Sequence, residues 1–526
     1  MLVKTFGAAV HGIDALIITI EVSVSKGFEF SIVGLPDAAV KESYERVMSA
    51  IGQSRMVPPH KQILINMSPA DVRKEGAAYD LPLAVGILAA DSQIQPHNLG
   101  RYLIMGELSL DGTLLPIKGA LPMAIKAREA GFEGMIVPLA NVDEAAVVNR
   151  LKVYGAESLS QVIDLLNGNS TLEPTVVDTR AEFAKAAEQF EFDFSEVKGQ
   201  ELVKRAFEVA CAGGHNILLV GPPGSGKSMM AKRLPSILPP LTLGEALETT
   251  KIHSVAGRLA RGSHLMTARP FRSPHHTISS VALVGGGSMH PMPGEISLAH
   301  NGILFLDELP EFSRAVLEVM RQPLEDRVIN ISRARYSVDY PAGFMLVASM
   351  NPCPCGYYNH PTKVCSCLPG AVNRYLSRIS GPLMDRIDMQ VEILPVPFDD
   401  LHAETESEKS ADIRNRVVAA RRIQTARFES EPGIHCNAQM GPRQMARYAR
   451  LSPECAGILR DAMNKLDLSA RAYDRIIRVA RTIADLDSSA DIAPQHLREA
   501  ISYRNLDRSS WGSTIPKIQA KAGPQS

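Results

Sequence analysis

The sequence predicts an α/β protein of more than one domain. Its 526 residues are enough for about two to four domains of ordinary size. A glycine-rich segment, Gly221–Ser228, lies between an apolar run at 216–220 and the expected start of a helix at 228–234, which indicates a strand–loop–helix unit of a parallel sheet. A second apolar run at 303–306 ends in two acids, and residues 1–167 alternate β-branched runs with helical periodicity.

Composition and charge exclude several classes of protein. Hydrophobic residues make up 45% of the chain and charged residues 21%, as in ordinary globular proteins. The net charge of −1 gives no overall attraction to nucleic acid or membranes, so any contact with DNA must come from local basic clusters. His11, Asp14 and Glu21 interrupt the N-terminal apolar stretch, so neither a secretory signal nor a membrane span is expected. Seven cysteines in such a chain predict a reducing, cytoplasmic location.

The segment Gly221–Ser228 fits the phosphate-binding loop (P-loop) pattern G-x-x-x-x-G-K-[ST]. Glycines allow the tight turns that point backbone N–H groups at phosphate oxygens, and the positive end of the next helix also faces them. Lys227 is expected to reach the β- and γ-phosphates of ATP, and the Ser228 hydroxyl to bind Mg²⁺. The residues predicted to hold the nucleotide are Gly221, Pro222, Pro223, Gly224, Ser225, Gly226, Lys227 and Ser228.

A buried strand followed by two acids is expected at Ile303–Glu308. The carboxyl ends of strands are where α/β sheets place their ligands. Asp307 is therefore predicted to hold Mg²⁺, directly or through water, and Glu308 to orient and deprotonate the attacking water. A further strand at 344–350 ends in Asn351. This residue resembles the sensor-1 asparagine of AAA+ ATPases, which contacts the γ-phosphate or the water; an asparagine that only forms a turn is the alternative.

The segment Gly381–Asp388 resembles the part of AAA+ ATPases that supplies an arginine finger to the neighbouring subunit. The resemblance assigns the finger to Arg386, with Arg378 as the second choice. A guanidinium in that place stabilises the charge that spreads over the γ-phosphoryl group in the transition state.

A helix is expected over Ser469–Leu486, with Ser469 as its N-cap and one apolar stripe. Arg471, Arg475 and Arg478 share another face of this helix. Arg471 occupies the place of the sensor-2 arginine of AAA+ ATPases. Charged faces of helices are mostly solvated, and a solvated side chain is the expectation for Arg475.

The first 167 residues also contain segments that resemble the proteolytic domain of Lon proteases: Gly106–Gly112, Leu115–Gly119 and Ala130–Pro138. A Lon protease needs a serine nucleophile and a lysine base. In this chain those positions fall on Ala78 and Met123. The resemblance therefore implies a Lon-protease-like (ribosomal S5 domain 2-like) fold without proteolytic activity, used for assembly or partner binding. A protease with rearranged catalytic residues is the alternative.

A Lon-like domain joined to this ATPase unit resembles the YifB/ComM family of magnesium-chelatase-like AAA+ proteins. The motifs that carry the resemblance include Gly199-Gln200, Phe271–His276 and Gly285–Gly287, and the resemblance covers nearly the whole chain. It implies assembly into a homo-hexamer. It also implies an ATP-driven DNA helicase that promotes branch migration in recombination and natural transformation.

Four cysteines lie within fifteen residues: Cys353, Cys355, Cys365 and Cys367. Four thiolates can close a tetrahedral Zn²⁺ site, although soft thiolates also suit an iron–sulfur cluster. Structural zinc is the favoured interpretation, and four free thiols are the alternative. His360 is expected to be a loop residue and not a ligand.

Residues 327–339 are expected to form two strands with two arginines at the tip. In AAA+ helicases a hairpin at this place, just before the sensor strand, projects into the central pore. Arginine and tyrosine side chains there could contact phosphates and stack on bases. A second segment, 272–276, could face the same pore, and an ordinary surface hairpin is the alternative. The candidate DNA-binding residues are Arg333, Arg335, Tyr336, Arg272, His275 and His276.

These expectations divide the chain into five parts. They are a Lon-like domain (1–167), a linker (168–190), an AAA+ core (191–398) with a zinc loop (353–367), a helical lid (399–505) and a disordered tail (506–526). The favoured function is an ATP-hydrolysing motor that acts on DNA. The alternatives are the motor subunit of a metal chelatase and a protein-remodelling ATPase whose Lon-like domain binds polypeptide.

Overall fold

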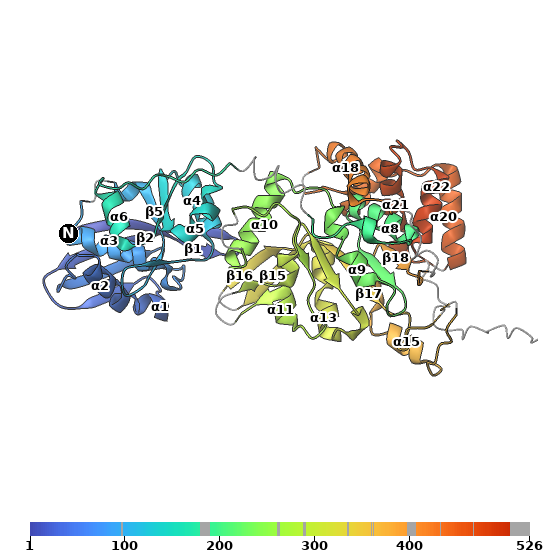
Figure 1. The fold of residues 1–526 in the computed structure, drawn as a ribbon, viewed down its shortest axis with the longest axis horizontal. Coiled ribbons are helices and arrows are strands. Elements are labelled where there is room, and N and C mark those ends of the chain that lie inside the picture. The colour runs from blue at the N-terminus through green and yellow to red at the C-terminus, as the bar shows by residue number, and fades with distance from the viewer. Residues whose placement is uncertain are drawn as a thin grey trace, which may run out of the picture.

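The computed structural model describes residues 1–526 except 96–97, 179–189, 260–263, 288–290, 334–335, 359, 361, 397–406, 432, 467 and 505–526. Residues 179–189 of the expected linker and all of the expected tail (506–526) therefore lie outside the described residues. Two α/β units and a group of C-terminal helices follow one another along the long axis (Figure 1). Among the described residues, no helix is long and apolar enough to cross a bilayer.

The first α/β unit is built on a seven-stranded mixed sheet with the order β3-β4-β2-β1-β5-β8-β9. Its strands are β1 (Leu2–His11), β2 (Asp14–Ser25), β3 (Phe30–Val33), β4 (Gln62–Ser68), β5 (Tyr102–Ile104), β8 (Gly134–Pro138) and β9 (Lys152–Ala156). Its helices are α1 (Ala38–Lys41), α2 (Ser43–Gln53), α3 (Asp80–Ala90), α4 (Ala120–Glu129), α5 (Leu139–Ala146) and α6 (Leu159–Leu166). Helices α3 and α4 pack on β1 and β2, and every residue of α3 is buried.

Several local predictions for this unit are confirmed and others need correction. The β-branched run at 15–24 and the apolar run at 80–90 predict a strand and a helix, which are present as β2 and α3. The pair Asp111-Gly112 predicts a hairpin, which is present as β6 (Glu107–Leu108) with β7 (Leu114–Leu115). Strand β1 was not predicted, because its Gly and Ala residues have low β-propensity; pairing with β2 along its whole length stabilises it. The sequence at 135–138 predicts the last strand of this unit, but a further strand, β9, follows it.

The second α/β unit is built on a five-stranded sheet with the order β11-β14-β17-β10-β18, in which every neighbouring pair is parallel. The strands are β10 (Ile217–Val220), β11 (Phe271–Arg272), β14 (Ile303–Leu306), β17 (Met345–Met350) and β18 (Met389–Glu392). The three central strands β10, β14 and β17 are buried on both faces, which explains their continuous apolar sequences.

The helices of this unit are mostly short. They are α8 (Glu201–Gly213), α9 (Lys227–Ala231), α10 (Leu243–Val255), α11 (Ser280–Val284), α12 (Glu295–Leu298), α13 (Arg314–Val319), α14 (Arg321–Asp326), α15 (Ala371–Leu376) and α16 (Gly381–Met384). Two antiparallel hairpins accompany them: β12 (Gly285–Gly286) with β13 (Met292–Pro293), and β15 (Val328–Arg333) with β16 (Tyr336–Pro341). The predicted hairpin over 327–339 is therefore present.

Helix α10 joins the two α/β units, as Figure 1 shows. Gly119 N–H, at the start of α4, donates to the carbonyl of Ser254 (3.3 Å), and the Ser254 hydroxyl donates to buried Glu144. Lys251 forms an ion pair with Asp14 (2.8 Å). Leu241 and Ala246, next to and within α10, belong to the hydrophobic core of the first unit. The first unit is therefore packed against the second and also meets hairpin β15–β16, where Val338 lies against Gly12.

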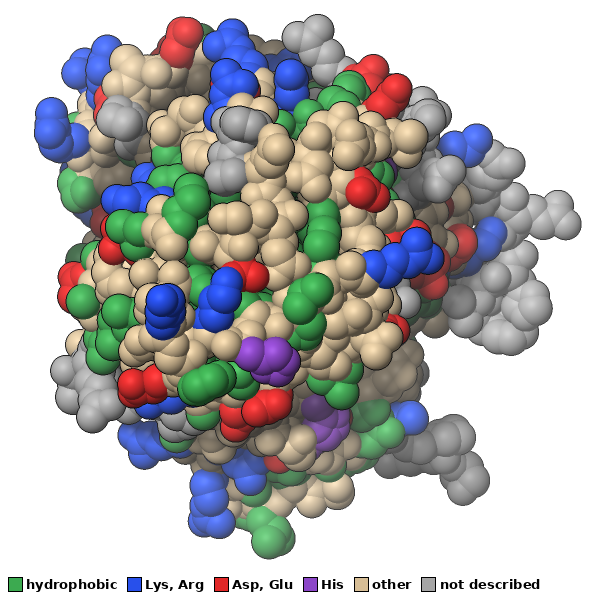
Figure 2. All heavy atoms as spheres, turned by 90° about the vertical axis from the view of Figure 1, so that its left-hand side faces the viewer, with side chains coloured by type: hydrophobic (Ala, Val, Ile, Leu, Met, Phe, Trp, Pro, Cys, Tyr) green, Lys and Arg blue, Asp and Glu red, His purple; other side chains and the backbone are tan. Residues whose placement is uncertain are grey.

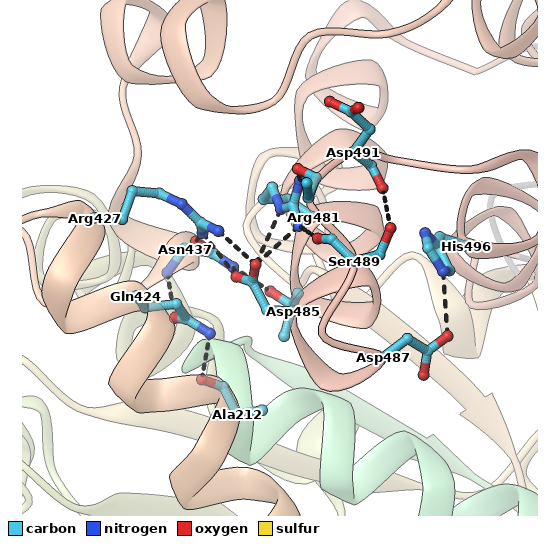
Figure 3. A network of polar contacts seen from close by, with 12 residues as sticks. Ala212, Gln424, Arg427, Asn437, Arg481, Asp485, Asp487, Ser489, Asp491 and His496 are labelled. Atoms are coloured by element: carbon cyan, nitrogen blue, oxygen red, sulfur yellow. Dashed lines mark hydrogen bonds and ion pairs between the residues drawn. The ribbon is translucent and has the colours of Figure 1, made fainter.

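The C-terminal helices pack against α8. They are α18 (Ser410–Arg427), α19 (Pro442–Tyr448), α20 (Pro453–Leu466), α21 (Ala470–Leu486) and α22 (Pro494–Ser502), and both α18 and α21 contact α8. Helix α21 has the predicted Ser469 N-cap. Asp485 of α21 is 1% exposed and accepts hydrogen bonds from Arg481 (2.9 Å) and Asn437 (2.7 Å) and forms an ion pair with Arg427 (Figure 3).

A buried ion pair connects α21 to the second sheet. Arg475 Nη1 lies 2.6 Å from Asp388 Oδ1, and the Asp388 side chain is 1% exposed. The expectation of a solvated Arg475 is therefore wrong, because an acid just before β18 faces this side of the helix. Burial alone would raise the pKa of Asp388, but Arg475 and His215 hold it well below its usual range. His215 is fully buried, and its Nε2 shares a hydrogen bond with the Thr482 hydroxyl (2.8 Å). Burial lowers the pKa of His215.

We expect the Asp485→Asn substitution to destabilise the C-terminal helices by about 3 kcal/mol, because Arg427 and Arg481 would lose the opposite charge that compensates their burial. Thermal unfolding of the full chain at pH 7 measures the effect. Asp461→Asn, on the exposed side of α20, is the control and should leave the unfolding temperature unchanged. Equal unfolding temperatures for the two variants would contradict the importance of this network.

The neutral, buried His215 predicts a loss of stability in mild acid. In the unfolded chain a histidine takes up a proton below a pH of about 6.5, whereas folded His215 does so only at lower pH because its pKa is lowered. The free energy of unfolding should fall below that pH by up to about 1.4 kcal/mol per pH unit. Urea denaturation between pH 7 and pH 5 should show a shallower fall for His215→Asn. The exposed control His435→Asn should follow the native chain, and three parallel curves would refute the assignment.

Candidate active site

The candidate site lies at one edge of the five-stranded sheet, where three buried parallel strands end together. Val220 of β10 is aligned with Met350 of β17, and Leu306 of β14 with Ala348. The residues that follow these strands are Gly221, Asp307 and Asn351. The parallel register therefore brings the P-loop, the acidic pair and the predicted sensor asparagine to one place, as expected of ligand sites in α/β sheets.

The P-loop leaves β10 and enters α9 through glycines that no other residue would replace well. Gly224 and Gly226 have φ angles of +79° and +86°, in the left-handed region that favours glycine. A Cβ on Gly221 would lie 2.5 Å from the carbonyl oxygen of Ile393. Among the described residues, the buried Ser225 hydroxyl has no hydrogen-bond partner, so this loop keeps an unused polar group.

Lys227 points back into the P-loop. Its Nζ donates to the carbonyl oxygens of Gly221 (2.7 Å) and Pro222 (2.9 Å) and to Asn351 Oδ1 (3.3 Å). Burial lowers the pKa of Lys227, and the nearby acids Asp307 and Glu308 oppose that shift. Lys227 and Asn351 are thus brought together as the sequence predicted, and both can turn toward an anion.

Ser228 and Asp307 face each other across the loop. Ser228 Oγ donates to Asp307 Oδ2 (2.6 Å), and a hydroxyl beside a carboxylate is a pair of hard oxygen ligands of the kind that Mg²⁺ takes. The other Asp307 oxygen accepts a hydrogen bond from the Ser349 hydroxyl. Ser349 was not predicted as a site residue. The available signal was a single polar residue in the otherwise apolar, buried strand β17.

Glu308 adopts an uncommon backbone conformation, with a φ of +54°. Its side chain remains 57% exposed, and Oε2 lies 3.7 Å from His276 Nδ1. The His276 ring packs against that of His275, with a centroid separation of 4.1 Å and the ring planes tilted by 34°. The segment 272–276, predicted as a contact to DNA, therefore reaches the predicted catalytic glutamate.

The candidate finger arginines are both held within their own chain. Arg386 is 13% exposed, forms an ion pair with Glu325 and donates to the Pro382 carbonyl (2.8 Å). Arg378 is 53% exposed and lies 2.9 Å from Glu311. An arginine that serves a neighbouring subunit must leave such a partner. Arg471, in the predicted sensor-2 place, is 63% exposed and paired with Asp385 (3.0 Å).

The candidate DNA-binding residues are only partly described. Arg335 lies outside the described residues, and Arg333 and Tyr336 are paired at the end of hairpin β15–β16. Arg272 is engaged by Glu295 through two contacts of 2.6 Å and 2.8 Å. His275 is exposed, and its Nδ1 lies 2.9 Å from the Thr277 hydroxyl.

The side chains of the four clustered cysteines lie close together in the structure. The ligand atoms of Cys353, Cys355, Cys365 and Cys367 all lie within 4.8 Å of one another. Three of the Sγ–Sγ distances are 3.3, 3.8 and 3.5 Å, near the edge of about 3.8 Å that four Zn–S bonds of ~2.3 Å give in a tetrahedron. The donor set therefore fits a zinc ion. Nδ1 of His360 accepts backbone N–H groups of Thr362 and Lys363, as a loop residue would.

The pKa values of the thiols in this cluster are shifted in different directions. Burial and the neighbouring thiol of Cys355 raise the pKa of Cys353 to about 12. Burial alone would also raise the pKa of Cys355, but the N–H group of Tyr357 and neighbouring donors lower it to about 6. The remaining cysteines Cys211, Cys436 and Cys455 are buried and free of disulfides.

Comparisons with known proteins identify relatives of the chain. Three family models match the chain: magnesium chelatase, subunit ChlI, over residues 193–401; subunit ChlI of Mg-chelatase over 20–141; and magnesium chelatase, subunit ChlI C-terminal, over 407–504. Lon protease 2 of Bacillus subtilis is 26% identical over 147 residues, which cover 27% of this chain and 26% of that protein.

Two relatives match almost from end to end. The YifB protein of Salmonella typhimurium is 45% identical over 505 residues, covering 95% of this chain and 96% of that protein. The competence protein ComM of Haemophilus influenzae is 41% identical over 505 residues, covering 96% of this chain and 97% of that protein. The chain therefore belongs to the YifB/ComM family of magnesium-chelatase-like AAA+ proteins.

Proposed function

We propose that the protein is an ATP-hydrolysing motor that works on DNA as a homo-hexamer. The observation that carries the proposal is the convergence of Lys227, Ser228, Asp307, Glu308 and Asn351 at one edge of the parallel sheet. ATP is the substrate of this site. Each subunit contributes these residues, and the neighbouring subunit contributes Arg386. The proposal includes the domain boundaries given above, a Lon-like first domain without protease activity and a cytoplasmic location.

The residues of the P-loop divide the work on the triphosphate. Lys227 exchanges its two carbonyl partners for phosphate oxygens. This exchange is favourable because the Lys227 ammonium group forms stronger hydrogen bonds with an anionic phosphate oxygen than with a neutral carbonyl oxygen. Asn351, already beside Lys227, then lies near the γ-phosphate. Glu308 takes the proton of the attacking water, and its exposed carboxylate is free to do so.

Ser228 and Asp307 would hold Mg²⁺, directly or through water. The ion would neutralise the charge of the β- and γ-phosphates. Ser349 keeps the Asp307 carboxylate in position through the oxygen that does not face Ser228. At the second metal site, Cys353, Cys355, Cys365 and Cys367 would hold a structural zinc ion.

DNA is the proposed partner because the family resemblance implies a helicase and because one near-full-length relative carries the name competence protein. Hairpin β15–β16 and the segment 272–276 are the proposed contacts. The face in Figure 2, at the end of the first α/β unit, carries acidic and basic side chains interspersed with hydrophobic ones. No continuous basic area is seen there among the described residues, and this face is not proposed to bind DNA.

Two other functions remain candidates in the same family. A metal chelatase motor would use the same ATP site, but it has no evident need for a Lon-like domain or a zinc loop. A protein-remodelling ATPase would use the first α/β unit to bind polypeptide. Salt-sensitive binding of DNA favours the motor on DNA, whereas stimulation of ATP hydrolysis by peptides favours remodelling.

Hydrolysis of ATP by the purified chain tests the proposal. Single-stranded, duplex or four-way-junction DNA should raise the rate several-fold, and Glu308→Gln should lower it by about 10²–10⁴-fold while ATP still binds. Glu454→Gln, an exposed acid of α20, is the matched control. Full activity of Glu308→Gln would refute the active site. If Glu308→Gln is inactive but no DNA changes the rate of ATP hydrolysis by the native chain, the protein-remodelling function is favoured instead.

A mixing experiment tests whether Arg386 acts in the neighbouring subunit. Arg386→Ala and Lys227→Ala should each hydrolyse ATP at rates lower by on the order of 10³-fold. A mixture of the two should recover part of the activity, because a P-loop from one variant can meet an arginine from the other. Recovery with Arg378→Ala in place of Arg386→Ala would reassign the finger to Arg378, and recovery with neither would contradict a finger supplied between subunits.

A further inference from the structure

The four-cysteine loop touches the P-loop directly. It begins at Cys353, two residues after Asn351 at the end of β17, and Gly356 of this loop lies against Pro223. A Cβ on Gly356 would lie 2.4 Å from Pro223 Cδ and 2.8 Å from Cγ, far inside ordinary van der Waals contact. The backbone of the cysteine loop is thus packed against the second proline of the P-loop, with no room for even a methyl group.

The position of Gly356 depends on the cysteines. Gly356 directly follows Cys355, and its N–H donates to the Cys353 carbonyl (2.9 Å). The Tyr358 N–H donates to Cys353 Sγ (3.3 Å), so both sides of the turn are fixed by the same cysteine. Cys353 and Tyr358 are buried with Val372 in a small cluster separate from the main cores. With so small a core, the thiol cluster must supply most of the order of this loop.

The P-loop rests on the same strand. The Gly221 N–H donates to the carbonyl of Met350 (3.2 Å), and Lys227 Nζ reaches Asn351. The P-loop is therefore in contact both with the end of β17 and with Gly356. The P-loop also contains two glycines with left-handed backbones, Gly224 and Gly226. Because glycine is conformationally permissive, the shape of the P-loop depends on the contacts that support it from outside.

We propose that the four-cysteine loop, closed by a bound metal ion, is a support of the P-loop that sets its affinity for nucleotide. The loop holds Gly356 against Pro223 and thereby keeps the P-loop in the form that receives phosphates. Loss of the ion loosens this contact and weakens nucleotide binding. By linkage, bound nucleotide must strengthen metal binding by the same factor. The inference rests on the proposed ATP site.

Two glycines of the chain offer a matched test. Gly356 and Gly370 both have left-handed backbones, with φ of +83° and +77°, but a Cβ on Gly370 would meet nothing within 4 Å. Gly356→Ala and Gly370→Ala therefore carry the same backbone strain, and only the first presses on Pro223. Titration with a fluorescent ATP analogue should show at least about tenfold weaker binding for Gly356→Ala, which is ~1.4 kcal/mol, and native affinity for Gly370→Ala. Equal affinities of the two variants would overturn the proposal.

A double-variant cycle identifies the contact itself. Pro223→Ala removes the two ring carbons that the new methyl group would strike. In the Pro223→Ala background, Gly356→Ala should cost little additional affinity. An equal cost in both backgrounds would show that the substitution acts elsewhere, for instance by ejecting the metal ion, and would overturn the contact as the route.

The metal part is tested by removal and return of zinc. The full chain stripped of zinc by a chelator under reducing conditions should bind the ATP analogue about tenfold more weakly, and added Zn²⁺ should restore the affinity. Conversely, the ATP analogue should raise the affinity for Zn²⁺ in competition with a chromogenic chelator. Unchanged nucleotide affinity after stripping would refute the proposal. If the native, zinc-loaded chain does not bind the analogue at all, the proposed ATP site is refuted instead.

Discussion

The parallel register of β10, β14 and β17 is the constraint on which the rest of the structure depends. Val220, Leu306 and Met350 end these strands at one edge of the sheet. A slip of one residue would turn alternate side chains to the other face and move Asp307 by about 3.3 Å along the strand. The Ser228–Asp307 hydrogen bond and the contact between Lys227 and Asn351 would both be lost. The apolar and doubly buried sequences of these strands therefore determine the geometry of the site.

Groups from several parts of the chain surround this edge. His276 approaches Glu308 from the 272–276 segment, and Gly356 approaches Pro223 from the cysteine loop. Helix α10 and hairpin β15–β16 contact the first α/β unit. The segment 272–276 and the cysteine loop are therefore direct neighbours of the candidate site.

Local chemistry made some of this predictable from the sequence, and tertiary packing determined the rest. The P-loop, the acidic pair and the cysteine cluster have fixed spacing, so their residues could be named in advance. Strand β1, with Gly7, Ala8 and Ala9, has weak intrinsic preference and forms because β2 pairs with it. Arg475 resembles any charged residue on a helix face; only the approach of Asp388 from a strand distant in sequence buries it. Ser349 stands out locally only as a polar residue in an apolar strand, and its contact with Asp307 follows from the register of β14 and β17.

The most direct test of the account is a structure of the full chain with Mg²⁺ and a non-hydrolysable ATP analogue. The account predicts that Lys227 Nζ leaves the carbonyls of Gly221 and Pro222 for the β- and γ-phosphates. It also predicts that Ser228 Oγ turns from Asp307 to the magnesium ion, with Asn351 and Glu308 facing the γ-phosphate. A nucleotide bound away from this edge, or one bound there with the Lys227 and Ser228 contacts unchanged, would contradict it.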